Sequence, residues 1–461
     1  MSQELTAIRN SILNFPVSTL DDITEACTVD ALMAGDSRYY DLSSLRDTSG
    51  CEVIRKSLLE HARRGEFLHL LYTGHRGSGK TTELIELEEW AKKNGFLPVR
   101  EEVNREFGGV KLEYMDVCFL AISMVQNSLA EIGESLPFKD LKEFFLWFKE
   151  VVLEDTEERK SELTTEVDAQ IGGGFSLAKL IAKFSASYKA NSSHTVKIRE
   201  KLRSNPQQLI DRTVNLLNCG NEILKTTNYP KGFLLVFDNM DRFEPVDIDR
   251  LLNVNKNLIH DLSTHCIFTF PISLKYQPIS SPIQLSEADT TLSTPGLRRR
   301  GDEWASTVQA SVHDEAKVKR FRELLGNRFS PDLFEDSDDL DLLIKTSGGV
   351  IRDLMRMIVR AHLINTRGDK IDSNSVRKAI THYRNDYIRI LSNIPNGLKY
   401  LVAVECKNPK VSSEFSPETM RSLRFTSCLL EYLDETGEVW EDIHPILIES
   451  RVLREACDNP D

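Results

Sequence analysis

Short, continuous apolar runs alternate with helix-like segments over the first two-thirds of this chain. Runs without interspersed polar residues are typical of strands buried on both faces of a parallel sheet. Apolar positions at helical spacing predict helices over residues 51–65 and 83–93. This alternation predicts an α/β fold with a parallel sheet and helices on both faces. The strand candidates are residues 68–72, 96–103, 233–237 and 265–270.

The segment between the second and third strand candidates departs from this alternation. Residues 114–117 are interpreted as a short strand end, with Asp116 capping a helix that runs through residues 121–132. Residues 135–225 are charged and helical in spacing, which predicts a helical insertion in the core. Within it, residues 171–191 form a basic amphipathic pattern that suits a membrane or a partner, although packing on its own domain is the simpler interpretation.

The last third of the chain is predicted to be helical over residues 315–395 and to end in a small domain at residues 396–461. In that domain two β-capable stretches, 429–433 and 439–443, flank a turn at residues 434–437. Helices followed by a hairpin predict a winged-helix-like domain.

Composition places the chain among ordinary globular proteins, with 461 residues of which 40% are hydrophobic and 28% charged. No apolar run reaches the ~20 residues of a membrane-spanning helix, and no secretory signal pattern is present. The eight cysteines include no C-x-x-C pair, which favours reduced thiols over disulfides or a zinc site. We therefore expect a cytoplasmic protein without a membrane span.

Charge bears on the kind of partner. The net charge of −13 argues against a protein that coats nucleic acid. Residues 401–461 contain thirteen Asp and Glu but six Lys and Arg, a net charge of −7. An acidic hairpin is a poor ligand for a phosphate backbone, so the charge disfavours nucleic acid and favours a protein partner.

The strongest motif follows the first strand candidate. Residues 74–81, GHRGSGKT, fit the G-x-x-x-x-G-K-T pattern of a phosphate-binding loop between a strand and a helix. Its glycines let backbone N–H groups turn toward phosphate oxygens, and the helix N-terminus adds to that field. Lys80 is predicted to bind the β- and γ-phosphates, and Thr81 to bind Mg²⁺. The predicted nucleotide-binding residues are Gly74, His75, Arg76, Gly77, Ser78, Gly79, Lys80, Thr81 and Thr82.

A second candidate lies at the end of the apolar run 233–237, where Asp238 follows directly. In parallel sheets ligands bind at the carboxyl ends of the strands. Asp238 is therefore predicted to hold Mg²⁺ through water, and the expected cofactors are ATP and Mg²⁺. After the next strand candidate, Thr269 or Ser273 would lie near the γ-phosphate, and a purely local backbone role is equally open.

Arginines supply further candidates for contact with phosphate. Arg352 opens a predicted helix in SGGVIRDL, residues 347–354, where it is placed to report the γ-phosphate. Other arginines could reach a neighbouring subunit's nucleotide as an arginine finger, which leaves a homo-oligomer open. Solvated or salt-bridged arginines are the simpler interpretation. The finger candidates are Arg242, Arg298, Arg299, Arg300 and Arg328.

Taken together, GHRGSGKT, VFDNMDR, PIS and SGGVIRDL, in this order, resemble the AAA+ ATPases of the initiator and STAND-like branches. The resemblance implies a P-loop NTPase core, with Arg352 as the sensor-2 arginine and Ser273 near the sensor-1 position. It covers residues 50–395, and the possible wing extends it. With the sequence pattern it gives the expected domain order: an N-terminal helical segment (1–50), the P-loop core (51–285, with the insertion at 135–225), a helical lid (286–395) and the winged-helix-like domain (396–461).

One departure concerns the residue after Asp238. AAA+ proteins typically carry Asp-Glu there, but this chain has Asn239. The next acid is Asp241, at a spacing similar to that of NACHT-type STAND proteins. Asp241 is therefore the predicted catalytic acid, with Asn239 helping to position water, and slow turnover is expected.

Three functions remain open at this point. The first is an ATP-hydrolysing switch that controls assembly with a protein partner, through the helical insertion or the C-terminal domain. An anti-phage or signalling role follows only by fold-level analogy. The second is a DNA-associated initiator or loader, and the third a scaffold that binds ATP without hydrolysing it.

Overall fold

The computed structural model describes most of the chain between residues 13 and 458. The predicted amphipathic helix at residues 171–191 lies outside the described part. The described ranges are 13–46, 50–103, 111–153, 193–276, 284–301, 307–366, 368–405, 415–434 and 436–458.

Among these residues, five strands form a parallel sheet in the order β2-β3-β4-β1-β5. Every residue of β1, β3 and β4 is buried, which explains their continuous apolar sequences. The predicted α/β fold and its four strand candidates are confirmed; the edge strand β5 was not predicted. The strands are β1 (His69–Gly74), β2 (Leu97–Glu102), β3 (Phe233–Asp238), β4 (His265–Pro271) and β5 (Thr290–Leu292).

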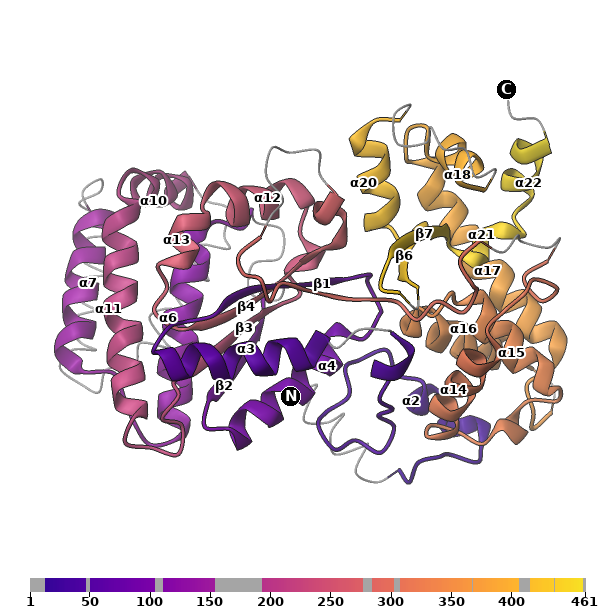
Figure 1. The fold of residues 1–461 in the computed structure, drawn as a ribbon, viewed down its shortest axis with the longest axis horizontal. Helices are drawn as coiled ribbons and strands as arrows, with labels where there is room; N and C mark the ends of the chain where they lie inside the picture. Colours follow the sequence, from indigo (N-terminus) through magenta and orange to yellow (C-terminus); the bar gives the residue numbers. More distant parts are fainter. Residues whose placement is uncertain are drawn as a thin grey trace.

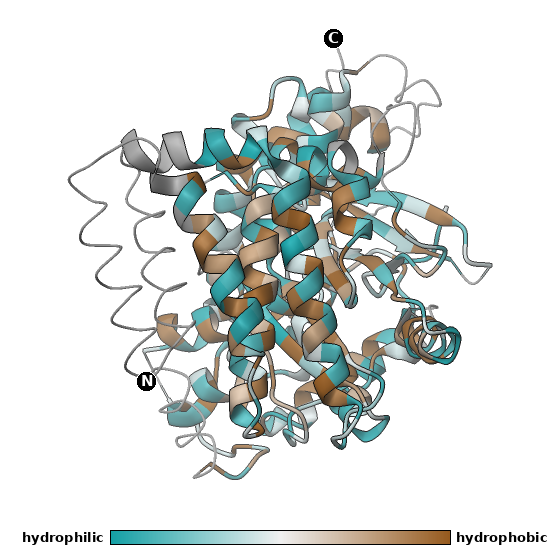
Figure 2. Cartoon of the chain, turned by 90° about the vertical axis from the view of Figure 1, so that its left-hand side faces the viewer, coloured by the Kyte–Doolittle hydropathy of each residue, from teal (hydrophilic) through white to brown (hydrophobic). Residues whose placement is uncertain are grey.

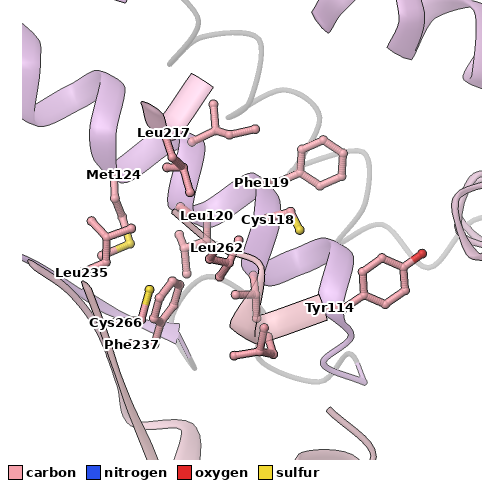
Figure 3. Close-up of a cluster of buried hydrophobic side chains, with 14 of the residues drawn as sticks. Tyr114, Cys118, Phe119, Leu120, Met124, Leu217, Leu235, Phe237, Leu262 and Cys266 are labelled. Carbon is pink, nitrogen blue, oxygen red and sulfur yellow. The ribbon is translucent and has the colours of Figure 1, made fainter. Parts of the chain in front are cut away.

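Helices cover both faces of this sheet (Figure 1). On one face α3 (Gly50–Arg64) and α4 (Lys80–Lys93) bury Ile54, Leu84 and Leu87 against Leu234 and Val236 of β3. On the other face α6 (Tyr114–Glu131) and α11 (Pro206–Leu224) pack on Leu235 and Phe237 of the same strand. Successive residues of β3 therefore serve opposite layers, as strand geometry requires. Figure 3 shows the second layer, with the Met124 side chain next to Leu235.

The start of α6 corrects the expectation for residues 114–117, which form the first helical turn and no strand. Glu113 is the N-cap residue, and the Asp116 side chain accepts a hydrogen bond from the Glu113 N–H at 2.8 Å. Asp116 thus belongs to a reciprocal capping box three residues inside the helix. The helix is buried nearly all round, so its sequence gives an apolar run that resembles a strand.

The described part of the predicted insertion is helical, as expected. Helices α7 (Phe138–Leu153) and α10 (Ser193–Ser204) pack with α11 on the outer side of α6. Figure 2 looks onto this end of the molecule, where hydrophilic and hydrophobic residues alternate along the helices as stripes. The hydrophobic stripes contribute Phe144 and Phe148 to the core beneath.

A second body of helices lies to the right of the sheet in Figure 1, at the opposite end of the molecule from α7, α10 and α11. Its buried side chains form one cluster with those of the N-terminal segment, from Val17 to Leu45, and of the C-terminal residues. The hairpin β6–β7 pairs antiparallel, as predicted, whereas the identification as a winged helix stays a prediction. The elements are α14 (Glu315–Gly326), α15 (Ser337–Thr346), α16 (Ile351–Ile364), α17 (Ser373–Ser392), α18 (Gly397–Glu405), α20 (Pro417–Phe425), β6 (Leu429–Leu433), β7 (Val439–Ile443), α21 (Pro445–Ile448) and α22 (Arg451–Asp458).

Within the described ranges, every helix falls short of the combined length and apolar character needed to cross a bilayer.

Candidate nucleotide-binding site

The loop between β1 and α4 lies at the carboxyl edge of the sheet, where the sequence predicts phosphate binding. Gly77 and Gly79 have φ angles of 86° and 98°, a left-handed region that favours glycine. At Gly77 an added Cβ would lie 2.6 Å from the Cβ of Arg352. Glycine at this position therefore permits both the turn of the loop and the close approach of the lid helix α16.

Lys80 is held inside the loop. Its ammonium group donates hydrogen bonds to the carbonyl oxygens of Gly74 at 2.9 Å and His75 at 3.1 Å. It also forms a salt bridge to Asp241 Oδ2 at 2.8 Å, with only 7% of the lysine side chain exposed. Because the same ammonium is predicted to bind phosphates, Asp241 and a bound nucleotide compete for it.

Asp241 reaches Lys80 because the chain turns sharply after β3. Asn239 has a φ angle of 62°, and asparagine tolerates this left-handed conformation better than most side chains. The turn leads into the short helix η3 (Met240–Arg242). Burial raises the pKa of Asp241, but the charges of Lys80, Arg76 and Arg242 outweigh it and hold the pKa below its usual range.

Asp238 has the features of a magnesium ligand. Its Oδ1 accepts a hydrogen bond from the Asn239 N–H at 2.7 Å. Its Oδ2 is buried and lies 3.7 Å from the Arg100 guanidinium, an ion pair beyond hydrogen-bond distance. Burial raises its pKa, and the nearby Thr81 hydroxyl lowers it in part. A carboxylate oxygen with spare capacity beside a threonine hydroxyl fits the oxygen ligands that Mg²⁺ prefers. These two residues therefore fit the predicted metal.

A cavity of about 250 Å³ opens above the loop, between the core and the lid. The N-terminal segment also lines it, including Leu32, Tyr39 and Leu42, a contribution that no sequence motif indicated. The predicted site residues that line this cavity are Arg76, Gly77, Gly79, Lys80, Thr81, Thr82, Asp238, Asn239, Asp241 and Arg352.

Arginines give the cavity a cationic rim. Arg352 and Arg242 line it from the lid and from the core, and Arg328 lines it from the segment after α14. Burial lowers the pKa of Arg352, and the neighbouring charges of Arg356 and Arg242 lower it further. This concentration of positive charge beside Lys80 suits a polyanionic ligand.

The remaining arginine-finger candidates do not line the cavity. Arg298 donates to Asp442 at 3.0 Å, and Arg300 pairs with Asp434 at 2.7 Å, so both bind the C-terminal hairpin of their own chain. Arg299 is exposed.

Three distant segments bind the loop. From the N-terminal segment, Arg46 donates to the Ser78 carbonyl oxygen at 2.7 Å. From the lid, the Arg352 N–H donates to the Gly77 carbonyl oxygen at 3.1 Å. From the C-terminal hairpin, the Glu431 N–H donates to His75 Nε2 at 2.7 Å. The loop is thus a junction between parts of the chain that are far apart in sequence.

The side chains of His75 and Arg76 point to the C-terminal residues. Burial and the charge of Lys80 lower the pKa of His75 to about 3, so its ring is neutral and Nε2 can accept from Glu431. The Arg76 guanidinium lies 3.9 Å from the ring centroid of Phe425, and it donates to the Asp241 carbonyl oxygen at 2.9 Å. The predicted binding of nucleotide by His75 can therefore concern only its backbone.

Thr269 and Ser273 differ in their surroundings. The Thr269 hydroxyl accepts from the Met240 N–H at 3.0 Å and donates to the Phe237 carbonyl oxygen at 3.3 Å. Thr269 thus supports the turn that positions Asp238 and Asp241. Ser273 is buried, its hydroxyl has no hydrogen bond within the described residues, and it does not line the cavity.

Comparison with known proteins gives distant structural matches. No family model and no curated protein matches the sequence. Among solved structures, a Walker-type ATPase of Pyrococcus abyssi is similar with 12% identity and a TM-score of 0.43, over 93% of this chain and 99% of that one. Drosophila ORC bound to DNA is similar with 12% identity and a TM-score of 0.39, over 98% and 99%. The assignment of a P-loop core therefore rests on the strand order, the loop and the position of Asp238 in this chain itself.

Proposed function

We propose that this protein is a magnesium-dependent ATPase that works as a switch. The observation that carries the proposal is the grouping of Lys80, Thr81 and Asp238 beneath a cationic cavity at the carboxyl edge of the sheet. Lys80 supplies charge for the β- and γ-phosphates, and the glycine-rich loop supplies backbone N–H donors. Mg²⁺, held by Thr81 and Asp238, would neutralise the charge that develops on the phosphates.

Arg352 completes this arrangement from the lid. Its backbone N–H donates to the Gly77 carbonyl oxygen, and Arg352 lines the cavity, which supports a role in reporting the γ-phosphate. Asp241 as catalytic acid, with Asn239 positioning water, stays a prediction from the sequence. The Asp241 carboxylate is paired with the Lys80 ammonium at 2.8 Å.

The switch follows from the contacts of the loop. Lys80 binds the carbonyl of His75, and His75 in turn binds the backbone of Glu431 in the hairpin. If Lys80 moves to bound phosphates, it leaves the carbonyl oxygen of His75. His75 is the residue whose ring accepts the hydrogen bond from the hairpin. The C-terminal segment then changes its contacts with nucleotide state, and we propose that it or the helical insertion presents a surface to a protein partner or to a second copy. The anti-phage or signalling setting stays a prediction.

The two other functions have weaker support. A role on DNA is opposed by the net charge of −7 over residues 401–461, because a basic surface is needed for phosphate contacts. A scaffold that binds ATP without hydrolysis is favoured only by the absence of a glutamate directly after Asp238.

Phosphate release with Mg²⁺ and ATP tests the proposal, in wild type and Lys80→Ala. We expect slow turnover in the wild type, not stimulated by DNA, and none in the variant. ATP binding without turnover would support the scaffold, and turnover that rises with DNA would support the loader. Identical rates in wild type and variant would remove this loop from the reaction.

A further inference from the structure

A carboxylate that no motif indicated lines the same cavity. Among the described residues, Glu102 is the last residue of β2, and it lines the cavity together with Lys80, Asp238 and Asp241. Its side chain is half-buried. Its neighbour Glu101 does not line the cavity.

Sheet register places Glu102 beside the magnesium ligand. Strand β2 pairs with β3 in parallel, and Glu102 is the register partner of Asp238. Neighbouring strands lie about 4.8 Å apart, so the two carboxylates start from adjacent backbone positions at the carboxyl edge. Successive side chains of a strand point to opposite faces, which explains why Glu102 reaches the cavity and Glu101 does not.

Asp241 is less well suited to accept a proton. A general base works best when its pKa lies near the working pH. Lys80 holds the Asp241 carboxylate at 2.8 Å, and the charges of Lys80, Arg76 and Arg242 keep its pKa below the usual range. When Lys80 moves to phosphates, the two arginines remain. The structure thus gives Asp241 the role of an internal counter-ion for Lys80.

We propose that Glu102 is the general base of ATP hydrolysis and orients the attacking water, an assignment that rests on the proposed ATPase function. The Glu102 carboxylate takes a proton from water, and the water oxygen forms a bond to the γ-phosphorus. The bond from that phosphorus to the β–γ bridging oxygen breaks, and its electron pair leaves with ADP. Glu102 then returns the proton to solvent, and the products are ADP and inorganic phosphate.

The full-length chain tests this with four variants, Glu102→Gln, Glu102→Asp, Glu101→Gln and Asp241→Asn. Equilibrium binding of Mg·ATP is measured first, followed by single-turnover hydrolysis. Glu102→Gln is nearly isosteric, so we expect binding within about threefold of wild type and a hydrolysis rate reduced about 100-fold or more. The matched control Glu101→Gln should hydrolyse at the wild-type rate. Glu102→Asp retains the charge but withdraws the carboxylate, and it should also be slow.

The outcomes separate the two proposals. If the wild type hydrolyses ATP and both Glu102 variants do so within threefold of its rate, Glu102 is not the base, while the ATPase function stands. A loss confined to Asp241→Asn would assign the base to Asp241 instead. A wild type that neither binds nor hydrolyses Mg·ATP would overturn the ATPase and Glu102 proposals together.

Discussion

The salt bridge between Lys80 and Asp241 gives the sharpest quantitative prediction. Asp241→Asn removes the charged partner of a lysine that is only 7% exposed. Loss of one member of a buried ion pair costs about 3–5 kcal/mol, because the other charge stays buried. Lys80 keeps its hydrogen bonds to the carbonyls of Gly74 and His75, so we expect the lower end, about 3 kcal/mol.

The same substitution should strengthen nucleotide binding. In the wild type, phosphates must displace Asp241 from Lys80, whereas the asparagine variant has no such pair to break. Removal of a carboxylate from the cavity also removes repulsion toward phosphates. We expect at least about tenfold tighter binding of Mg·ADP, which corresponds to about 1.4 kcal/mol.

Thermal unfolding with and without Mg·ADP measures both effects. Without nucleotide, the melting temperature of the variant should lie about 6–12 °C below that of the wild type. This follows because each kcal/mol of lost stability lowers the melting temperature of a domain of this size by about 2–4 °C. Saturating Mg·ADP should narrow that gap, because the phosphates replace Asp241 as partners of Lys80. Asp247→Asn, at a buried carboxylate outside the cavity, is the matched control, and nucleotide should leave its deficit unchanged. An Asp241→Asn variant as stable as wild type without nucleotide would refute the reasoning.

Three further predictions concern the loop and its surroundings. Burial lowers the pKa of both His75 and His265 to about 3, so below pH 6.5 the unfolded chain binds protons that the folded chain does not. The free energy of unfolding, measured with urea, should fall by about 1.6 kcal/mol per histidine between pH 6.5 and pH 5, and a flat profile would contradict this. Gly77→Ala adds a Cβ that meets Arg352 of α16, at a residue whose φ angle is 86°. Titration calorimetry should show ATP binding at least about tenfold weaker, and an unchanged affinity would exclude the close approach of α16 to the loop. Phe425→Ala removes the ring that stacks on Arg76, a contact that contributes about 1 kcal/mol. The rate of hydrogen exchange in residues 415–425 should therefore rise, and an equal rate would show that this contact does not hold α20 in place.

The sequence was most informative where local chemistry alone determines geometry. The spacing of GHRGSGKT predicts a strand, a tight loop and a helix, and β1 and α4 have these positions. The apolar run before Asp238 likewise predicts a buried strand that ends at the ligand edge, and β3 does so. Both predictions concern residues that are adjacent along the chain.

Contacts between distant residues were not predictable in this way. Glu102 is the last residue of a half-buried strand, and its position beside Asp238 appears only when the pairing with β3 is known. Arg46 and Glu431 bind the loop from segments without any motif, because such contacts depend on packing. Strand β5 has three residues, too few to produce a pattern.

The most direct test of the switch is the hydrogen-exchange rate of the Glu431 backbone amide, which donates to His75 of the loop. The rate is measured without nucleotide and with a non-hydrolysable Mg·ATP analogue at saturation. If the loop transmits nucleotide state to the hairpin, the two rates should differ by at least about tenfold, equivalent to about 1.4 kcal/mol in opening. Equal rates with and without the analogue would contradict the account.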